Sequence, residues 1–216
     1  MARPEKSSSA LEYYTEEETE KYTRNKHIRK IQTQMTQKCI EILEMGDGVI
    51  LDIGCGSGHS LTAIQDYSIE QNIKNTIIGL DINDNMLKLC KNEEVSLICY
   101  DIGNGLPFFP GSFDYIISIS CLQWLFYPIN KEKIEDRIKK FFFSLYSVMK
   151  RESSACFQIY FESKWQIELL LKIIKKTGFI GGLIREGEGK KQKYFLLLDC
   201  IKKKRKIKFI EEKKKK

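Results

Sequence analysis

The sequence predicts an α/β protein whose doubly wound sheet has seven strands, mostly parallel, with one antiparallel strand near the C-terminus. Three observations lead to this fold class. Short apolar runs of strand type alternate with amphipathic segments of helical period. The first strand opens into a turn with glycine at alternate positions, and three successive strands end in aspartate. Such residues belong to the edge at which open α/β sheets bind ligands.

The length of 216 residues suits a single domain. We expect an N-terminal segment that covers the ligand (residues 1–26), the main domain (27–201) and a basic tail (202–216). The tail holds ten basic residues and two acids, a net charge of +8, whereas the whole chain carries +7. This basic run suits phosphate backbones and resembles a nuclear import signal. A solvated, disordered end is the alternative.

Membrane, disulfide and metal chemistry are not indicated. No apolar run approaches the roughly 18 residues of a membrane span, and the N-terminus lacks a secretory signal, so we expect a soluble, intracellular protein. The seven cysteines are odd in number, scattered and never in a C-x-x-C pair, which favours reduced core thiols. Since His27 and His59 have no neighbouring ligand residues, no metal is predicted.

The first part of the chain reads as two helices. We expect a short helix from Glu16 to Arg24 that folds over the ligand. From His27 to Leu43 apolar residues recur every three or four positions, as on one face of an amphipathic helix. Gly46 and Gly48 end this helix before the first strand.

The run Val49–Gly58 is a buried strand that leads into a glycine-rich turn. Glycine at Gly54, Gly56 and Gly58 permits positive φ angles and lets a ligand lie against the backbone. The dinucleotide pattern G-x-G-x-x-G would need glycine where His59 stands, and the Gly-Lys-Ser/Thr of a phosphate loop is absent. A glycine turn without a ligand is the alternative.

Two further strands end in acids. A helix over residues 57–67 leads to the strand Thr76–Asp81, whose aspartate is placed to accept both hydroxyls of a ribose. Asn83 caps the next helix, and Asp81 as a capping or surface acid is the alternative. The third strand covers 95–101 and ends in Asp101.

The three strand-end acids, Asp52, Asp81 and Asp101, are expected along one edge of the sheet. They suit a ligand rich in hydrogen-bond donors. S-adenosylmethionine carries an ammonium group, a ribose and an adenine amine, so it provides all three kinds of donor.

The remaining elements continue the alternation. We expect a fourth strand over 113–120, an aromatic loop over 121–128 and a long helix over 131–150. A strand over 155–161, a helix over 164–177 and a hairpin-like pair over 182–184 and 194–201 complete the sheet.

Several motifs together resemble the eukaryotic 18S ribosomal RNA (guanine-N7) methyltransferases, a family of class I, Rossmann-like, S-adenosylmethionine-dependent enzymes of small-subunit biogenesis. The resemblance covers about residues 3–200. It rests on the glycine turn and on more specific motifs: Tyr22-Thr23, Ile31-Gln32, Met35-Thr36, Leu80-Asp-Ile82, Met86-Leu87, Gly105–Phe108, Gly111–Asp114, Ile117–Ser120, Gln123-Trp-Leu125, Phe141-Phe142 and Gly178–Leu183.

The resemblance implies a role for each matching position. The three glycines of the turn would hold the methionyl part of the cofactor, Asp81 the ribose, Ile82 the adenine face, and Asp101 with Ile102 the adenine edge. Asp52 and Ser118 complete the expected set of cofactor-binding residues.

The resemblance also implies partners and a location. Members of the family act with a small zinc-binding activator subunit, and the apolar third strand, Val95–Tyr100, would be the sheet edge to which it adds a strand. An edge protected by the chain's own helix or loop is the alternative. We expect 18S rRNA or its small-subunit precursor as substrate, and the nucleus (nucleolus and nucleoplasm) as location, with the cytoplasm as a further one.

Guanine N7 has an in-plane lone pair and no proton, so methyl transfer to it needs no general base, and no catalytic residue is assigned. Trp124 or Tyr127 is expected to stack on the target base; core packing is the alternative for Trp124. Two rival functions stay open: a small-molecule methyltransferase, and an assembly factor of the pre-ribosome in which catalysis is secondary.

Overall fold

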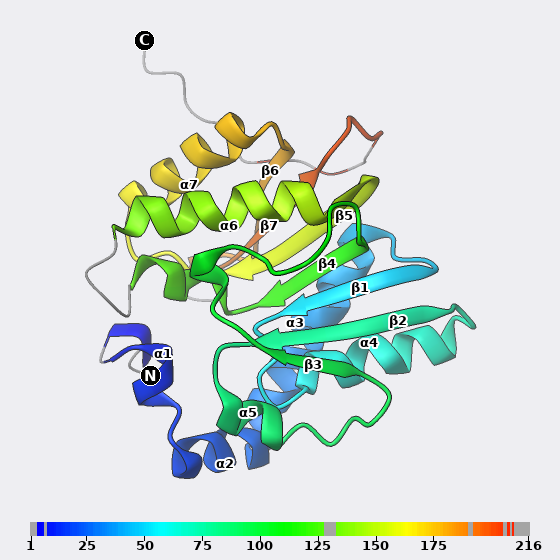
Figure 1. Ribbon diagram of the computed structural model, residues 1–216, viewed down its shortest axis with the longest axis vertical. Helices are drawn as coiled ribbons and strands as arrows, with labels where there is room; N and C mark the ends of the chain where they lie inside the picture. The colour runs from blue at the N-terminus through cyan, green and yellow to red at the C-terminus, as the bar shows by residue number, and fades with distance from the viewer. Residues whose placement is uncertain are drawn as a thin grey trace.

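A seven-stranded sheet lies between two layers of helices in the computed structural model, which describes residues 4–6, 8–127, 133–189, 192–204, 207 and 209 (Figure 1). The strand order is β3-β2-β1-β4-β5-β7-β6. Neighbouring strands pair in parallel except β7, which is antiparallel to both β5 and β6. The predicted fold class is therefore confirmed. The strands are β1 (Gly48–Ile53), β2 (Asn75–Asp81), β3 (Ser96–Cys99), β4 (Phe113–Ile119), β5 (Met149–Ile159), β6 (Ile180–Glu186) and β7 (Lys193–Asp199).

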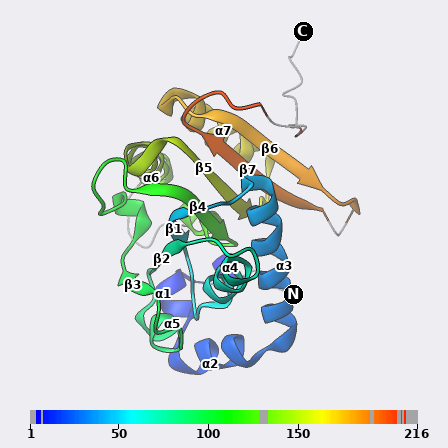
Figure 2. The same ribbon diagram turned by 90° about the vertical axis from the view of Figure 1, so that its right-hand side faces the viewer.

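The helices divide between the two faces of the sheet. One core joins the sheet to α3 and α4, through side chains such as Cys39 and Ile64; the other joins it to α6 and α7, through side chains such as Phe141 and Ile173. Figure 2 shows these layers on opposite sides of the strands. The helices are η1 (Pro4–Lys6), α1 (Ala10–Tyr13), α2 (Glu16–Arg24), α3 (Lys26–Leu43), α4 (His59–Glu70), α5 (Asp84–Lys88), η2 (Ile102–Asn104), η3 (Leu122–Phe126), α6 (Ile134–Val148) and α7 (Lys164–Thr177).

The strand order creates a switch point beside β1. The chain runs outward from β1 to β2 and β3, and then returns to the other side of β1 to form β4 and β5. The connections after β1 and β4 consequently leave in opposite directions, which opens a crevice at the carboxyl ends of these strands. The ligand edge predicted from the strand-end acids lies at this crevice.

Several predicted boundaries need correction. β5 begins at Met149 rather than at Ala155, because Met149 pairs with Phe113 and the register then shifts at a bulge before Tyr115 pairs with Ser154. The polar residues in between hid this start, and the preceding helix ends at Val148. The predicted helices over 16–24 and 164–177 are confirmed. Pro128, residues 131–132 and most of the basic tail lie outside the described residues.

One face of the sheet is unevenly covered. Between β3 and β4 the chain forms only the short η2 and loops, so no α-helix of this connection lies over β1, β2 and β3 on the side of α6 (Figure 1). Among the strands that the structure describes, β3 is also an edge strand, with β2 as its one neighbour. Within the described ranges, none of the helices has both the length and the apolar character needed to cross a bilayer.

Candidate functional site

A cavity lies at the switch point, at the carboxyl ends of the central strands. It holds about 810 Å³ of space, its open mouth included. Its wall combines the glycine turn, two strand-end aspartates and a group of aromatic side chains. Among the residues that line it are Gly54, Gly56, Asp81, Ile82, Asp101, Ile102, Ser120, Cys121, Trp124, Tyr127 and Arg137, together with Ala10, Tyr14 and Tyr22 of the N-terminal segment.

The glycine turn is held against the end of β2. The amides of Gly54 and Cys55 both donate to the carbonyl oxygen of Leu80, at 2.6 and 3.1 Å. Gly54 and Gly56 have φ angles of +74° and +54°, in the region that favours glycine. Among the described residues, a methyl group on Gly56 would approach only the sulfur of Met86, at 3.9 Å, so its backbone is open for a ligand to lie against.

Asp81 orients the turn at the carboxyl end of β2. Its Oδ2 accepts a hydrogen bond from the Gly56 amide and its Oδ1 accepts one from the Asn83 amide, both at 2.8 Å. Burial raises the pKa of Asp81, and these amides act against that rise. Each carboxylate oxygen keeps lone pairs for a further donor, such as a ribose hydroxyl. Asn83 caps α5 through the amide of Met86, as predicted.

Asp101 lines the cavity at the end of β3, but its carboxylate already has a strong partner. Arg137 of α6 binds it with two nitrogens, at 2.9 and 3.0 Å, and the Gly103 amide donates to it at 2.8 Å. The sequence reasoning missed Arg137, although a signal was present. Arg137 stands among apolar residues of helical spacing, between Ile134 and Phe141, and is 6% exposed.

Asp52 does not reach the cavity. The next residue of β1, Ile53, joins the core under α6. Because side chains alternate along a strand, Asp52 points to the opposite face of the sheet. There it is fully buried and accepts a hydrogen bond from the Ser60 hydroxyl of α4. The expectation that three acids line one edge therefore holds for Asp81 and Asp101 only.

Gly58 and Ser118 also lie away from the cavity wall. Gly58 has a φ of +90° and directly precedes α4 as its N-cap; it borders a second hollow, on the outer side of the turn beside His59. Ser118 is buried within β4, where its hydroxyl donates to the carbonyl oxygen of Ile53 at 2.7 Å. Gly58 thus ends the glycine turn, and Ser118 binds the end of β1 from which the turn begins.

We expect the buried Asp52 to make folding stability depend on pH. Burial raises its pKa to about 7, and the nearby Asp81 adds to the rise. In the unfolded chain aspartate titrates near 4, so as the pH rises from about 4 to 7 the unfolded chain loses this proton first and the native state loses stability, by about 4 kcal/mol at most. Asp52→Asn should remove this loss.

Urea denaturation at pH 5 and pH 8 measures the effect. The stability gain of Asp52→Asn over wild type should be larger at pH 8 by about 2 kcal/mol or more, whereas Asp66→Asn, an exposed acid on α4, should give no such difference. Equal gains at both pH values would contradict the buried, proton-binding state of Asp52.

Aromatic side chains from the N-terminal segment and from η3 meet over the cavity. The rings of Tyr14 and Trp124 lie 6.0 Å apart, and Tyr14 contacts Tyr22 edge-on at 5.9 Å. The Asn83 amide side chain donates to the Tyr14 carbonyl at 2.9 Å, which ties this segment to α5. Burial raises the pKa of the Tyr14 hydroxyl and that of the Tyr22 hydroxyl above their usual values, so both side chains are uncharged at neutral pH.

Ser120 occupies a strained position at the end of β4. Its φ is +55°, unusual for a residue other than glycine. Three bonds hold it there: its amide and hydroxyl donate to the backbone and side-chain oxygens of Gln158, at 3.0 and 2.7 Å, and its carbonyl accepts from Gln123 at 2.7 Å. Nothing in the sequence pattern indicated this conformation.

The cavity fits the expected cofactor in three respects. Asp81 has acceptors free for ribose hydroxyls. Gly56 leaves space for close approach of the ligand, and aromatic rings with nearby carboxylates suit a sulfonium cation. Among the described residues no group of three or more potential ligand side chains could hold a metal ion, and all seven cysteines are free.

Comparison with known proteins finds methyltransferases by family model and by sequence identity. A family model described as a methyltransferase domain matches residues 50–142. An 18S rRNA (guanine-N(7))-methyltransferase of Schizosaccharomyces pombe is 37% identical over 93% of this chain and 75% of its own length. The enzyme of that name from Mus musculus is 39% identical over 91% of this chain and 70% of its own length.

A solved structure shares the fold at lower identity. It is a complex between the Haloferax volcanii Trm112 methyltransferase activator and a methyltransferase. The match has a TM-score of 0.62 and 13% identity, and covers 85% of this chain and 97% of the other.

Proposed function

Because this chain belongs to the family of 18S rRNA (guanine-N(7))-methyltransferases, we propose that it transfers a methyl group from S-adenosylmethionine to N7 of a guanine in 18S ribosomal RNA. The observation that carries this proposal is identity of 37–39% to enzymes of that name over more than nine-tenths of the chain. The cavity at the switch point of the sheet supports it. The product serves small-subunit biogenesis.

The reaction asks for alignment rather than for acid–base catalysis. When bound, S-adenosylmethionine supplies a methyl group activated by its sulfonium centre. Guanine N7 attacks with a lone pair and has no proton to lose, so the chain needs only to hold N7, the methyl carbon and the sulfur in line. Such orientation supplies about 7–11 kcal/mol of barrier reduction.

We assign the cofactor end of the cavity to Asp81, Gly54 and Gly56, which meet at the carboxyl ends of β1 and β2. The base end then belongs to η3 and the N-terminal segment. Trp124 is half-buried and lines the cavity beside Tyr14, which favours stacking on the target base over core packing. A guanine reached in this way is held out of its RNA helix.

The proposal is tested with the full chain, purified small-subunit precursor RNA and S-adenosylmethionine, by chemical cleavage at 7-methylguanosine. Trp124→Ala should lower methyl transfer by about 10-fold or more, as expected for loss of base stacking, while S-adenosylhomocysteine affinity changes by less than about 3-fold. Trp165→Ala, which removes the other tryptophan at an exposed position, is the control. Cofactor binding without any 7-methylguanosine would overturn the proposed reaction.

The two rival functions predict different results. A small-molecule methyltransferase would use the cofactor site without a need for the basic tail, so removal of residues 202–216 would leave its activity unchanged. An assembly factor would support small-subunit maturation even in a variant that cannot bind the cofactor. Either result, in place of the RNA methylation above, would favour the corresponding rival.

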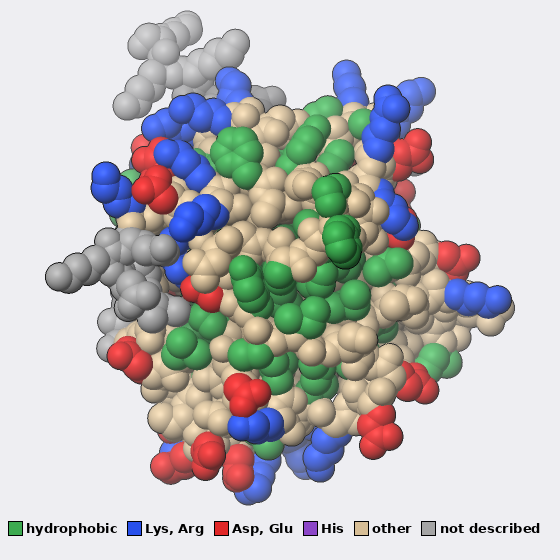
Figure 3. Space-filling view, in the orientation of Figure 1, with side chains coloured by type: hydrophobic (Ala, Val, Ile, Leu, Met, Phe, Trp, Pro, Cys, Tyr) green, Lys and Arg blue, Asp and Glu red, His purple; other side chains and the backbone are tan. Residues whose placement is uncertain are grey.

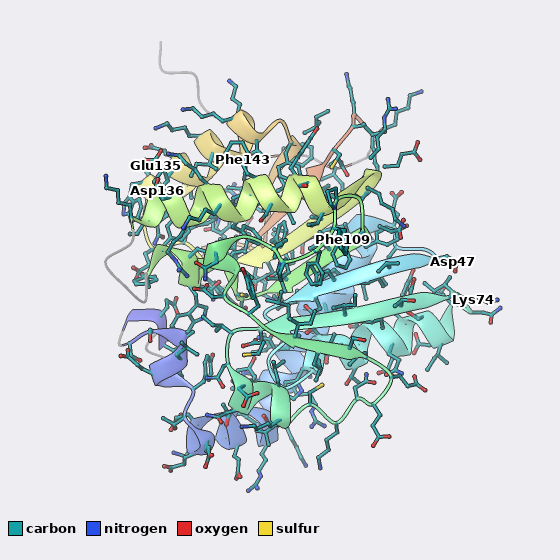
Figure 4. All side chains as sticks on the ribbon, viewed as in Figure 1. Asp47, Lys74, Phe109, Glu135, Asp136 and Phe143 are labelled. Carbon is teal, nitrogen blue, oxygen red and sulfur yellow. The ribbon has the colours of Figure 1, made fainter. Side chains whose placement is uncertain are left out.

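We also assign a protein partner to the bare side of the sheet. Apolar side chains gather in the middle of this face, over the central strands (Figure 3). Phe109, 86% exposed, points outward there (Figure 4). Ile98 of β3 pairs in register with Leu80 and therefore shares its face. An apolar face that ends in an unpaired strand edge suits a partner that adds a strand to β3.

The candidate partner is a Trm112-type activator, as in the solved complex of the Haloferax volcanii methyltransferase. We expect Ile98→Asp to weaken binding of the activator by about 10-fold or more, because a buried charge would face the partner. Ile180→Asp, an exposed apolar residue on the opposite edge strand β6, is the matched control. Co-purification and titration measure both. An Ile98→Asp chain that binds as tightly as wild type would exclude this edge.

The basic tail is proposed to contact RNA and to direct the protein to the nucleus. At its start the Lys203 ammonium donates to the Ser154 hydroxyl at 2.8 Å and to the Glu152 carbonyl, which fastens this part along β5. The charge of the run that follows supports both roles. Fluorescence microscopy of the tagged chain with and without residues 205–216 tests the location.

A further inference from the structure

The ion pair between Asp101 and Arg137 joins two distant parts of the chain at the wall of the cavity. Arg137 Nη1 lies 3.0 Å from Asp101 Oδ2, and Nη2 lies 2.9 Å from Oδ1. The Gly103 amide donates to Oδ1 at 2.8 Å. The side chain of Arg137 is 7% exposed and that of Asp101 is 21% exposed. The pair is therefore largely removed from water, and only the Asp101 carboxylate keeps appreciable exposure to the solvent.

The local backbone is built around the guanidinium. A methyl group placed on Gly103 would lie 2.1 Å from Cζ of Arg137 and 2.3 Å from Nη2, so the guanidinium fills the space that a side chain at position 103 would take. Asp101 in turn caps η2 through Gly103. The loop after β3 and the first turn of α6 are therefore shaped to each other through this one side chain.

A gain in stability does not explain the pair. Removing two charges from water costs several kcal/mol, and buried pairs are often replaced by apolar residues without loss. A planar guanidinium group that binds both oxygens does, however, fix the plane of a carboxylate, which a lysine ammonium cannot do. The geometry thus suits a carboxylate of Asp101 that is held in one orientation toward a ligand in the cavity.

We propose that Arg137 is a positioning residue for recognition of the cofactor's purine. It holds Asp101 so that the remaining acceptor site accepts a hydrogen bond from the exocyclic amine of adenine. A carboxylate offers about four lone-pair sites, of which the two Arg137 nitrogens and the Gly103 amide use three. This inference rests on the proposed function, because it assigns the Asp101 end of the cavity to the purine.

The arrangement makes the site selective. An adenine amine donates to the last acceptor of Asp101, whereas the keto oxygen of an inosine analogue would face that acceptor with its own lone pair. A site with a fixed polar partner discriminates strongly against a ligand that leaves it unpaired. The wild-type chain should therefore prefer S-adenosylhomocysteine over S-inosylhomocysteine, and this preference should depend on Arg137.

Calorimetric titration of both ligands into the full chain tests the proposal without RNA and without turnover. Arg137→Lys should lower the affinity for S-adenosylhomocysteine by about 10-fold or more and change that for S-inosylhomocysteine by less than about 3-fold, so that the ratio falls toward one. Gly103→Ala keeps both charges but fills the guanidinium's space, and should give the same loss of selectivity. Lys139→Gln, which removes a partly exposed charge from the same helix, is the control.

The outcomes separate this inference from the function on which it rests. Variants that keep the wild-type ratio of affinities, or that lose both ligands equally while remaining folded by circular dichroism, would overturn the role of Arg137 and leave the methyltransferase function standing. A wild-type chain that binds neither ligand would overturn both. If Arg137→Lys does not fold, Gly103→Ala decides the question, since its φ angle lies outside the glycine region.

Discussion

Asp81→Ala is expected to lower the affinity for S-adenosylhomocysteine more than about 100-fold. Hydrogen bonds to a charged group contribute about 1.5–3 kcal/mol each, and the carboxylate is proposed to accept two ribose hydroxyls. The substitution also releases the amides of Gly56 and Asn83, which Asp81 holds at 2.8 Å. Calorimetric titration of the variant beside wild type measures the effect.

Asp84→Ala is the matched control, because Asp84 lies three residues further on, is exposed and forms an ion pair with the ammonium of Lys88. It should bind like wild type. Asp81→Asn keeps the shape of the side chain and should fall between the two. A loss of less than about 3-fold in Asp81→Ala would remove the ribose from this strand end.

Gly54→Ala should lower the free energy of unfolding by about 3 kcal/mol or more. The new methyl group would lie 2.4 Å from Cβ of Cys121 and 2.5 Å from its sulfur, and overpacking of this kind costs about 1–3 kcal/mol. The φ of +74° adds about 1–2 kcal/mol for any residue with a Cβ atom. Urea denaturation measures the sum.

Gly111→Ala separates the two contributions. Gly111 has a similar φ, +66°, but a methyl group there would meet no atom of the described part of the chain within 4 Å. Its loss should therefore be only the conformational part, about 1–2 kcal/mol. Equal losses in the two variants would mean that Cys121 moves aside and that the turn is not packed as tightly as the distances indicate.

Much of the fold could be predicted because each element has a local signal. The apolar period of α3, the cap at Asn83 and the strand-end position of Asp81 are properties of neighbouring residues. The start of β5 at Met149 could not be predicted in this way, because its pairing with Phe113 across a bulge depends on a distant strand.

In the candidate site, too, the features with a local signal could be predicted and those that depend on distant residues could not. Gly54, Gly56, Asp81 and Asp101 could be placed at the cavity from their positions at strand ends. The direction of Asp52 depends on which face of β1 meets α4, and the partner of Asp101 comes from 36 residues further along the chain. Local patterns indicate where a side chain lies along the chain, but not which distant group competes for it.

The left-handed backbone conformation of Ser120, which lines the cavity, lowers the stability of the folded chain. A residue with a Cβ atom in that region costs about 1–2 kcal/mol, and glycine in its place would avoid the cost. Three hydrogen bonds keep it there instead: Ser120 donates two to Gln158 and accepts one from Gln123. Strain held in this way is a feature of binding sites: the chain gives up some resistance to unfolding so that the end of β4 stays in one shape before any ligand arrives.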